Sequence, residues 1–146
     1  MSAVAKPLPH PDRDSEPFWQ GVREGELRLQ RCGECRTLRF PPREICNRCY
    51  SERADWDVVS GRGRLVSWCV THQVFNPAYA DDVPYTVLQV ALEEQDDVQM
   101  IGRLEGEAEL RQGLPLRAVF VRASDTFDLI HWEADDAPST PEPSGP

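Results

Sequence analysis

The chain is poor in lysine and contains no long apolar run. Lys6 is its only lysine, so a buried amine for Schiff-base chemistry is missing from the body of the sequence. No segment approaches the length of a membrane-spanning helix, and residues 1–19 hold no apolar run that could serve as a signal peptide. We therefore expect a soluble, cytoplasmic protein that does not contact a membrane.

The charge of the chain is unevenly distributed. The 146 residues carry a formal net charge of −9 and are 40% hydrophobic, which is enough for one compact domain and a small satellite. Residues 26–64 hold nine arginines against six acids, a net charge of +3, so the remainder carries −12. One basic segment thus stands in an acidic protein.

Four of the five cysteines form two pairs in the spacing C-x2-C-x10-C-x2-C, and they are Cys32, Cys35, Cys46 and Cys49. Two tight turns that face each other would present four thiolates at the corners of a tetrahedron, which suits zinc. The same spacing is also compatible with two disulfides or with an iron site. Nothing in the sequence points to export, which argues against disulfides. We favour a structural zinc, because four cysteines leave no open coordination position.

The segment around the cysteines is too small to be stabilised by apolar burial alone, so metal binding is expected to supply much of its folding free energy. Turns of this kind often have glycine after the second cysteine, where φ is positive. Arg36 and Tyr50 occupy these positions here. Either these residues are strained or the turns are of another type.

Prolines gather at both ends of the chain, where little else is available to pack. Residues 1–25 are predicted to form a mobile N-terminus and a short docking helix, in which Ser15 is a candidate N-cap. Phe18 and Trp19 on this helix would either anchor it to its own ribbon or contact a partner. Residues 135–146 are predicted to be a disordered proline-rich tail.

After the cysteines the apolar pattern changes to a period of two. Val66, Trp68, Val70 and His72 share one predicted strand face, and five strands are expected over residues 64–74, 85–92, 98–104, 116–122 and 126–132. Residues 105–113 are predicted to be a short helix closed by Gly113. This pattern indicates a zinc ribbon over residues 26–59 and a five-stranded OB-fold barrel over residues 60–134, although another small β-barrel has the same periodicity.

Several segments in sequence order resemble the DUF35 family, whose members combine a rubredoxin-like zinc ribbon with a C-terminal OB-fold. They are FWQGVREGELRLQRCGEC, LRFPPREICNRC, SGRGRLVSWCV, VPYTVLQVALEE, IGRLEG and RQGLPLRAVFV, and together they cover roughly residues 16–132. The sequence departs from the family pattern at the two missing turn glycines and in the tail after Trp132. The resemblance implies a mainly β fold with an N-terminal helix.

The resemblance also implies a function that the residues alone do not reveal. Similar proteins associate with thiolase-superfamily enzymes, among them acyltransferases, thiolases and lipid-transfer-type aldolases of lipid, steroid or polyketide metabolism. The chain would then be a non-catalytic accessory subunit that binds such an enzyme and helps form an acyl-CoA site at the shared interface. Candidate partner-binding residues are Phe18, Trp19 and Phe40.

Candidate ligand-binding residues are Arg62, Arg64, His72 and Arg103. Guanidinium groups bind phosphates in bidentate fashion, and a histidine at a barrel mouth can bond a ligand carbonyl. The alternatives are solvated arginines paired with acids and a structural histidine. Cys69 and His72 do not form a catalytic pair, because an odd separation on a strand places them on opposite faces. We expect Cys69 to be buried or half-buried.

Nucleic-acid binding is the alternative function, because zinc ribbons and OB-folds both serve in it. The predicted barrel argues against this reading, because its many carboxylates would repel a phosphate chain. A scaffold role without any ligand contact also stays open.

Overall fold

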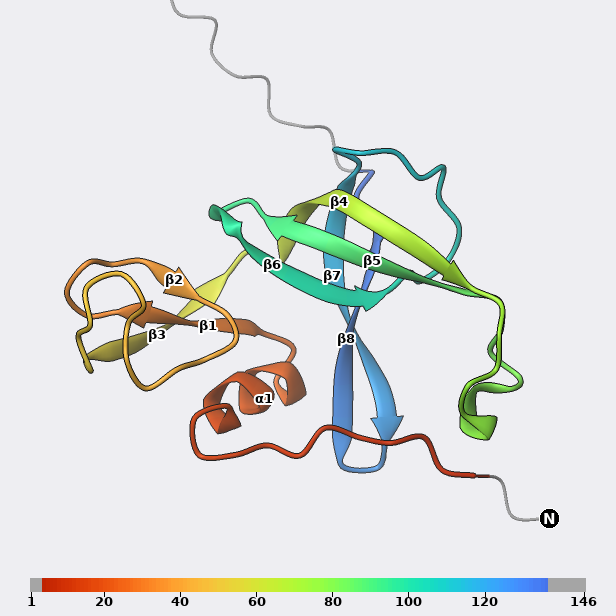
Figure 1. Cartoon of the computed structure of the whole chain (residues 1–146), viewed down its shortest axis with the longest axis horizontal. Coiled ribbons are helices and arrows are strands. Elements are labelled where there is room, and N and C mark those ends of the chain that lie inside the picture. Colours follow the sequence, from red (N-terminus) through yellow and green to blue (C-terminus); the bar gives the residue numbers. More distant parts are fainter. Residues whose placement is uncertain (1–3, 137–146) are drawn as a thin grey trace, which may run out of the picture.

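The computed structural model describes residues 4–136, which fold into a small zinc-ribbon sheet, one helix and a barrel (Figure 1). The helix and ribbon come first, as α1 (Glu16–Arg23), β1 (Leu27–Cys32), β2 (Leu38–Arg39) and β3 (Ala54–Val59). The barrel strands follow, as β4 (Arg62–Thr71), β5 (Tyr85–Leu92), β6 (Gln95–Arg103), β7 (Pro115–Ser124) and β8 (Phe127–Ala134), with the short 3₁₀ helix η1 (Pro77–Tyr79) after β4. Most of the predicted proline-rich tail and residues 1–3 lie outside the described residues.

The five barrel strands curl into an OB-fold. Their order is β6-β5-β4-β7-β8, with every hydrogen-bonded neighbour antiparallel. A parallel bridge between Leu104 and Trp132 joins the two edges and closes the barrel. An added Cβ at Gly102 would lie 2.6 Å from Trp132 Cδ1, so glycine is needed where β6 meets the indole. The mainly β fold class predicted from the sequence is confirmed.

Strand β4 contains an irregularity that changes its buried face. Its register with β5 shifts between Leu65 and Ser67, so that Leu65 pairs with Val90 and Trp68 with Leu88. Val90 and Leu88 are two residues apart and share a face, so Leu65 and Trp68 share one also. Leu65, rather than the predicted Val66, is therefore the buried residue at the start of this face.

Residues 105–113 do not form the predicted helix. The connection is tied to the barrel at both ends, where Glu105 N–H donates to Trp132 O and Gly113 N–H donates to Leu65 O, each over 2.8 Å. Gly106 has a φ of 70°, which the interior of a helix does not allow. A helix of this length is also marginal on its own, and it would place the Glu105 and Glu109 carboxylates one turn apart.

Helix α1 lies over the ribbon sheet and beside the β7–β8 hairpin (Figure 1). Phe18 contacts the rings of Trp19 and Phe40, at centroid distances of 5.0 and 5.2 Å, and Trp19 lies 5.0 Å from Phe127 at the hairpin tip. Ser15 makes no side-chain cap to the helix, and its hydroxyl donates to Asp12 Oδ1 over 2.6 Å. The aromatic cluster thus joins helix, ribbon and barrel in one core.

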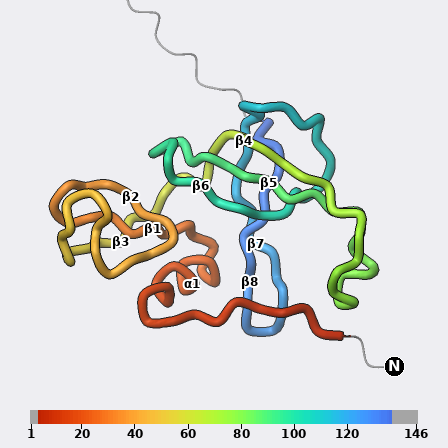
Figure 2. The backbone as a smooth tube through the Cα atoms, in the orientation of Figure 1, coloured from red at the N-terminus to blue at the C-terminus, as the bar shows by residue number. Residues whose placement is uncertain are grey.

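The segment before α1 crosses the β7–β8 hairpin near its tip (Figure 2). Its Lys6 Nζ lies 2.6 Å from Asp82 Oδ2 in the loop after β4. Pro7 and Leu8 line a cavity with Val121 and Leu129 of the hairpin. Among the described residues, no helix is long and apolar enough to cross a membrane.

Candidate functional site

The four paired cysteines converge at the far end of the ribbon. Their sulfur atoms all lie within 4.8 Å of one another, with 3.5 Å between Cys32 and Cys49 and 3.7 Å between Cys35 and Cys46. These separations exclude disulfides, in which the sulfurs are about 2 Å apart. A zinc–sulfur bond of about 2.3 Å gives a tetrahedron with edges of about 3.8 Å, so the sulfurs fit a structural zinc.

The two cysteine turns have the same backbone hydrogen bonds. Cys32 O accepts from Arg36 N–H and Cys46 O from Tyr50 N–H, while Glu34 and Arg48 N–H donate to the sulfurs of Cys32 and Cys46. Arg36 and Tyr50 have φ values of 61° and 60°. The turns are therefore of the usual knuckle type, with non-glycine residues in the left-handed conformation that glycine adopts more easily.

Hydrogen bonding also prepares two of the thiols for a metal. The backbone N–H groups of Cys49 and Arg48 lower the pKa of Cys46 to about 6. Hydrogen bonds from Thr37, through its side chain and its backbone, lower the pKa of Cys35. Because thiolate is the form that binds zinc, both effects favour metal binding, whereas hydrogen bonding to the other cysteines and burial raise the pKa of Cys49 to about 11.

The predicted ligand-binding residues fall into two groups along the barrel. Arg64 lies opposite Ala91 and Arg103 opposite Val87, four residues apart on β5, which corresponds to about 13 Å. Three of the four candidates are ion-paired: Arg62 with Asp135, Arg64 with Asp96 and Arg103 with Asp82. His72 is exposed just beyond the end of β4. Arg103 also lines a cavity with Tyr85 and His131. A shared role for the four residues stays a prediction.

One expectation about a single residue is wrong. Cys69 is exposed, contrary to the prediction that it is buried or half-buried, because it lies on the outer face of β4 beside Val87. Phe18 is buried in the aromatic cluster, so a partner at this helix would meet only the half-buried Trp19 and Phe40. Partner binding through these two residues stays a prediction.

The cavity that Pro7 and Leu8 line has a volume of about 370 Å³ and lies on the outside of the barrel. Asp82 joins Lys6 and Arg103 at its edge, and their hydrogen bonds lower the pKa of the Asp82 carboxyl. His131 lines it and has Nδ1 2.5 Å from Glu105 Oε1. Sequence reasoning missed this pair, because only the bridge that closes the barrel brings residues 105 and 131 together.

Comparison with known families finds two matching domains, and the boundary between the two matches falls within β3. Residues 19–55 match the family described as ChsH2, rubredoxin-like zinc ribbon domain. Residues 56–121 match the family described as ChsH2, C-terminal OB-fold domain. The cysteine cluster therefore lies in a zinc-ribbon domain, and its cofactor is a structural zinc.

The chain is similar to two curated proteins, of which it covers different shares. The chain is 36% identical over 130 residues to the 3-oxo-4,17-pregnadiene-20-carboxyl-CoA hydratase alpha subunit of Mycobacterium tuberculosis, covering 88% of this chain and 40% of that protein. It is 27% identical over 114 residues to a DUF35 domain-containing scaffold protein of Methanocaldococcus jannaschii, covering 75% of this chain and 79% of the other. The chain therefore spans well under half of the hydratase subunit.

A solved structure resembles the whole architecture. The Ltp2–ChsH2(DUF35) aldolase contains a chain that superposes with a TM-score of 0.78 and 29% sequence identity, covering 87% of this chain and 98% of that one. The ribbon, helix and barrel described above thus recur together in one chain of similar extent.

Proposed function

Because this chain belongs to the DUF35 family of zinc-ribbon and OB-fold proteins, we propose that it is a non-catalytic accessory subunit of a thiolase-superfamily enzyme that acts on acyl-CoA. The single observation that carries the proposal is the likeness to nearly the full length of the DUF35 chain in the Ltp2–ChsH2(DUF35) aldolase. The partner is accordingly an aldolase or another thiolase-like protein, and the acyl-CoA lies at the shared interface.

The chemistry of the described residues supports a role without catalysis. Lys6 is paired with Asp82 and its side chain is 48% exposed, so it is not the desolvated amine that Schiff-base chemistry uses. The four clustered cysteines complete a zinc shell without an open position for substrate. The reacting groups would therefore come from the partner.

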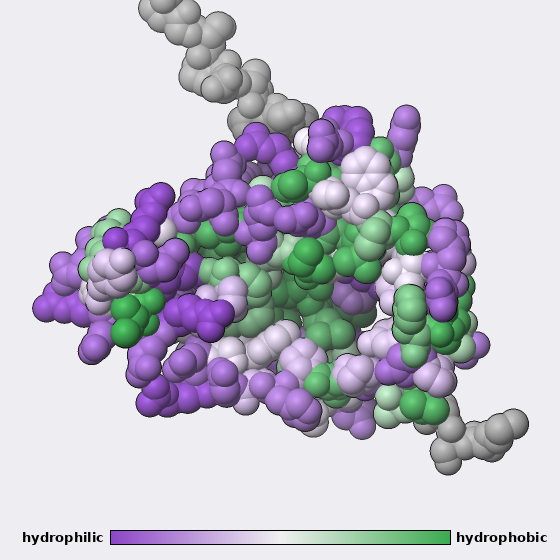
Figure 3. Space-filling view, in the orientation of Figure 1, coloured by the Kyte–Doolittle hydropathy of each residue, from purple (hydrophilic) through white to green (hydrophobic). Residues whose placement is uncertain are grey.

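An exposed apolar patch offers a surface for such a partner. It consists of Trp68, Val70, Val74 and Phe75, at the end of β4 and in the loop that follows, and Phe75 is 83% exposed. Apolar residues also gather over the barrel in Figure 3, whereas the ribbon side is mostly hydrophilic. Exposed aromatic and aliphatic side chains that lie close together are typical of protein interfaces.

The nucleic-acid alternative gains no support. The relatives reported above are named as a hydratase subunit, a scaffold protein and an aldolase. Most arginines of the barrel are engaged by carboxylates, which leaves little free positive charge for a phosphate chain.

Co-expression with an Ltp2-type thiolase-superfamily protein from the same organism tests the proposal. We expect the two chains to co-purify in a fixed ratio, and Phe75→Ser with Val70→Ser to reduce the recovered complex at least about tenfold. Val58→Ser is the matched control, because Val58 is an exposed apolar residue on the ribbon. Failure of the unmodified chain to co-purify would refute the accessory role, whereas equal loss with the control variant would refute only the assigned surface.

A further inference from the structure

Most arginines of this acidic chain are ion-paired, and most of the unpaired ones lie together at one place. Of fifteen arginines, eleven have a carboxylate oxygen within 4.0 Å among the residues that the structure describes. Three of the remaining four, Arg39, Arg43 and Arg48, line a single cavity between the ribbon and the barrel. Unpaired positive charge is therefore concentrated at one place in a protein with a large excess of acids.

Arg39 is the most unusual of the three, because it is only 5% exposed. Its Nε donates to Gln30 Oε1 over 2.9 Å and its Nη2 to the carbonyl oxygen of Arg43 over 3.2 Å, and both acceptors are neutral. Its Nη1 is buried and has no hydrogen-bond partner among the described residues. A buried cation without a counter-charge is costly, and each unsatisfied donor adds to that cost.

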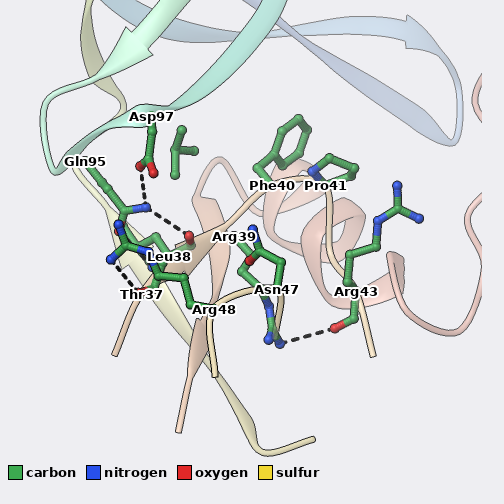
Figure 4. A pocket seen from close by; sticks show the side chains of 11 residues that line it. Thr37, Leu38, Arg39, Phe40, Pro41, Arg43, Asn47, Arg48, Gln95 and Asp97 are labelled. Atoms are coloured by element: carbon green, nitrogen blue, oxygen red, sulfur yellow. Dashed lines mark hydrogen bonds between the residues drawn. The ribbon is translucent and has the colours of Figure 1, made fainter. Parts of the chain in front are cut away.

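The cavity has a volume of about 240 Å³ and is lined by polar groups from both domains (Figure 4). Asn47 and Arg48 border it from the second cysteine turn, and Gln95 and Asp97 from the start of β6. Arg48 Nη1 contacts only Thr37 Oγ1, at 3.3 Å. Asp97 accepts from the Gln95 amide over 2.7 Å and is not within ion-pairing distance of the arginines.

The charge of the zinc site does not account for these arginines through direct contact. Four thiolates around Zn²⁺ carry a net charge of −2, which nearby cations would offset. Yet the sulfurs form their hydrogen bonds to other residues with backbone N–H groups and, at Cys35, with the Thr37 hydroxyl, and with no described arginine side chain. Arg39 donates instead to the Arg43 carbonyl oxygen in the ribbon loop, and Arg39, Arg43 and Arg48 all line the cavity.

We propose that this cavity binds an oxyanion of the phosphate type. Guanidinium groups bind phosphate oxygens through charge-assisted hydrogen bonds, and Arg39, Arg43 and Arg48 line the cavity without a carboxylate within ion-pairing distance among the described residues. A cavity of about 240 Å³ lies below the roughly 300–1,000 Å³ of sites for drug-sized ligands, so it takes one phosphate or diphosphate group rather than a whole cofactor. That this group belongs to coenzyme A rests on the proposed function.

Calorimetric titration of the zinc-loaded full chain with sodium pyrophosphate at constant ionic strength tests the site. We expect saturable binding, which Arg43→Gln with Arg48→Gln weakens at least about tenfold, because each lost charged hydrogen bond is worth about that factor or more. These two positions are exposed, so the variant is expected to fold, whereas Arg39→Gln would remove a buried side chain that bonds the ribbon loop. Arg111→Gln is the matched control, because Arg111 is the fourth unpaired arginine and lies outside the cavity.

Absence of saturable binding, or equal weakening by Arg111→Gln, would overturn the site, since the second result means a general charge effect. Coenzyme A and dephospho-coenzyme A form the second arm, because the latter lacks the 3′-phosphate. Stronger binding of coenzyme A would identify its 3′-phosphate as the group held. Equal binding of the two, with pyrophosphate still bound, would assign the site to the diphosphate or to another phosphate source. Neither arm depends on co-purification of a partner, so the two proposals fail separately.

Discussion

The zinc ribbon and the OB-fold barrel are stabilised in different ways, although they lie side by side. The ribbon organises its two turns by hydrogen bonds to sulfur and by the metal that the sulfurs bind, and it carries most of the unpaired positive charge. The barrel is closed around fully buried apolar residues, including Leu65, Leu88 and Trp132. The comparison indicates that metal binding organises the cysteine turns of the ribbon and apolar packing the barrel, although the ribbon strands and the barrel share one apolar core.

The largest effect is expected from removing one zinc ligand. Cys46→Ser replaces a buried thiolate in a site whose metal binding is worth roughly 10 kcal/mol or more to folding in small zinc domains. We expect loss of zinc and of ribbon order while the barrel stays folded. Metal analysis together with amide hydrogen exchange checks this, and a barrel that unfolds with the ribbon would contradict the separation of the two regions.

A substitution in the barrel core should lower the stability of the barrel and leave zinc binding by the ribbon unchanged. Leu88→Ala removes a fully buried side chain and is expected to lower the free energy of unfolding by roughly 2–5 kcal/mol. Ile101→Ala on the neighbouring strand is the control, because Ile101 is 66% exposed and should change stability by less than about 0.5 kcal/mol. Denaturant unfolding measures both. Zinc content should be unchanged in either variant, and zinc loss in Leu88→Ala would show that the two regions are coupled.

The smallest effect is expected at the second cysteine turn. Tyr50 is exposed with φ at 60°, a conformation that costs a non-glycine residue roughly 1–2 kcal/mol. Tyr50→Gly removes that cost but adds about 0.5–1 kcal/mol of chain entropy, so a gain of about 0.5 kcal/mol is expected. Tyr50→Ala keeps the conformational cost and should give no gain. Competition of each variant with a zinc chelator provides the measurement, and a weaker hold on zinc in Tyr50→Gly would show that the tyrosine side chain itself supports the turn.

The features that sequence could predict are those that depend on spacing. The cysteine pairs and the alternating strands follow from short-range patterns, and both appear in the structure as expected. The prediction of a helix over residues 105–113 is wrong, because hydrogen bonds to Trp132 and Leu65, which are distant in sequence, determine the backbone conformation of that segment. The bulge near Val66 was hidden because one extra residue leaves the apolar pattern intact while it shifts the face.

The candidate sites were less predictable for a related reason. Arg62, Arg64 and Arg103 were predicted to bind ligand phosphates because they are cations, but in the structure each of them is paired with an aspartate. Arg39, Arg43 and Arg48 stand out only after the partners of every other arginine are known. Their significance depends on which carboxylates are near, and that information lies in the tertiary structure.

The most direct test of the central claim is an activity measurement on the reconstituted pair. An Ltp2-type partner is assayed on its acyl-CoA substrate alone, with this chain, and with this chain after zinc removal. We expect that the chain alone has no activity, that it raises the activity of the partner, and that zinc removal diminishes this gain. Turnover by the chain alone, or a partner whose activity is the same with and without it, would refute the accessory role.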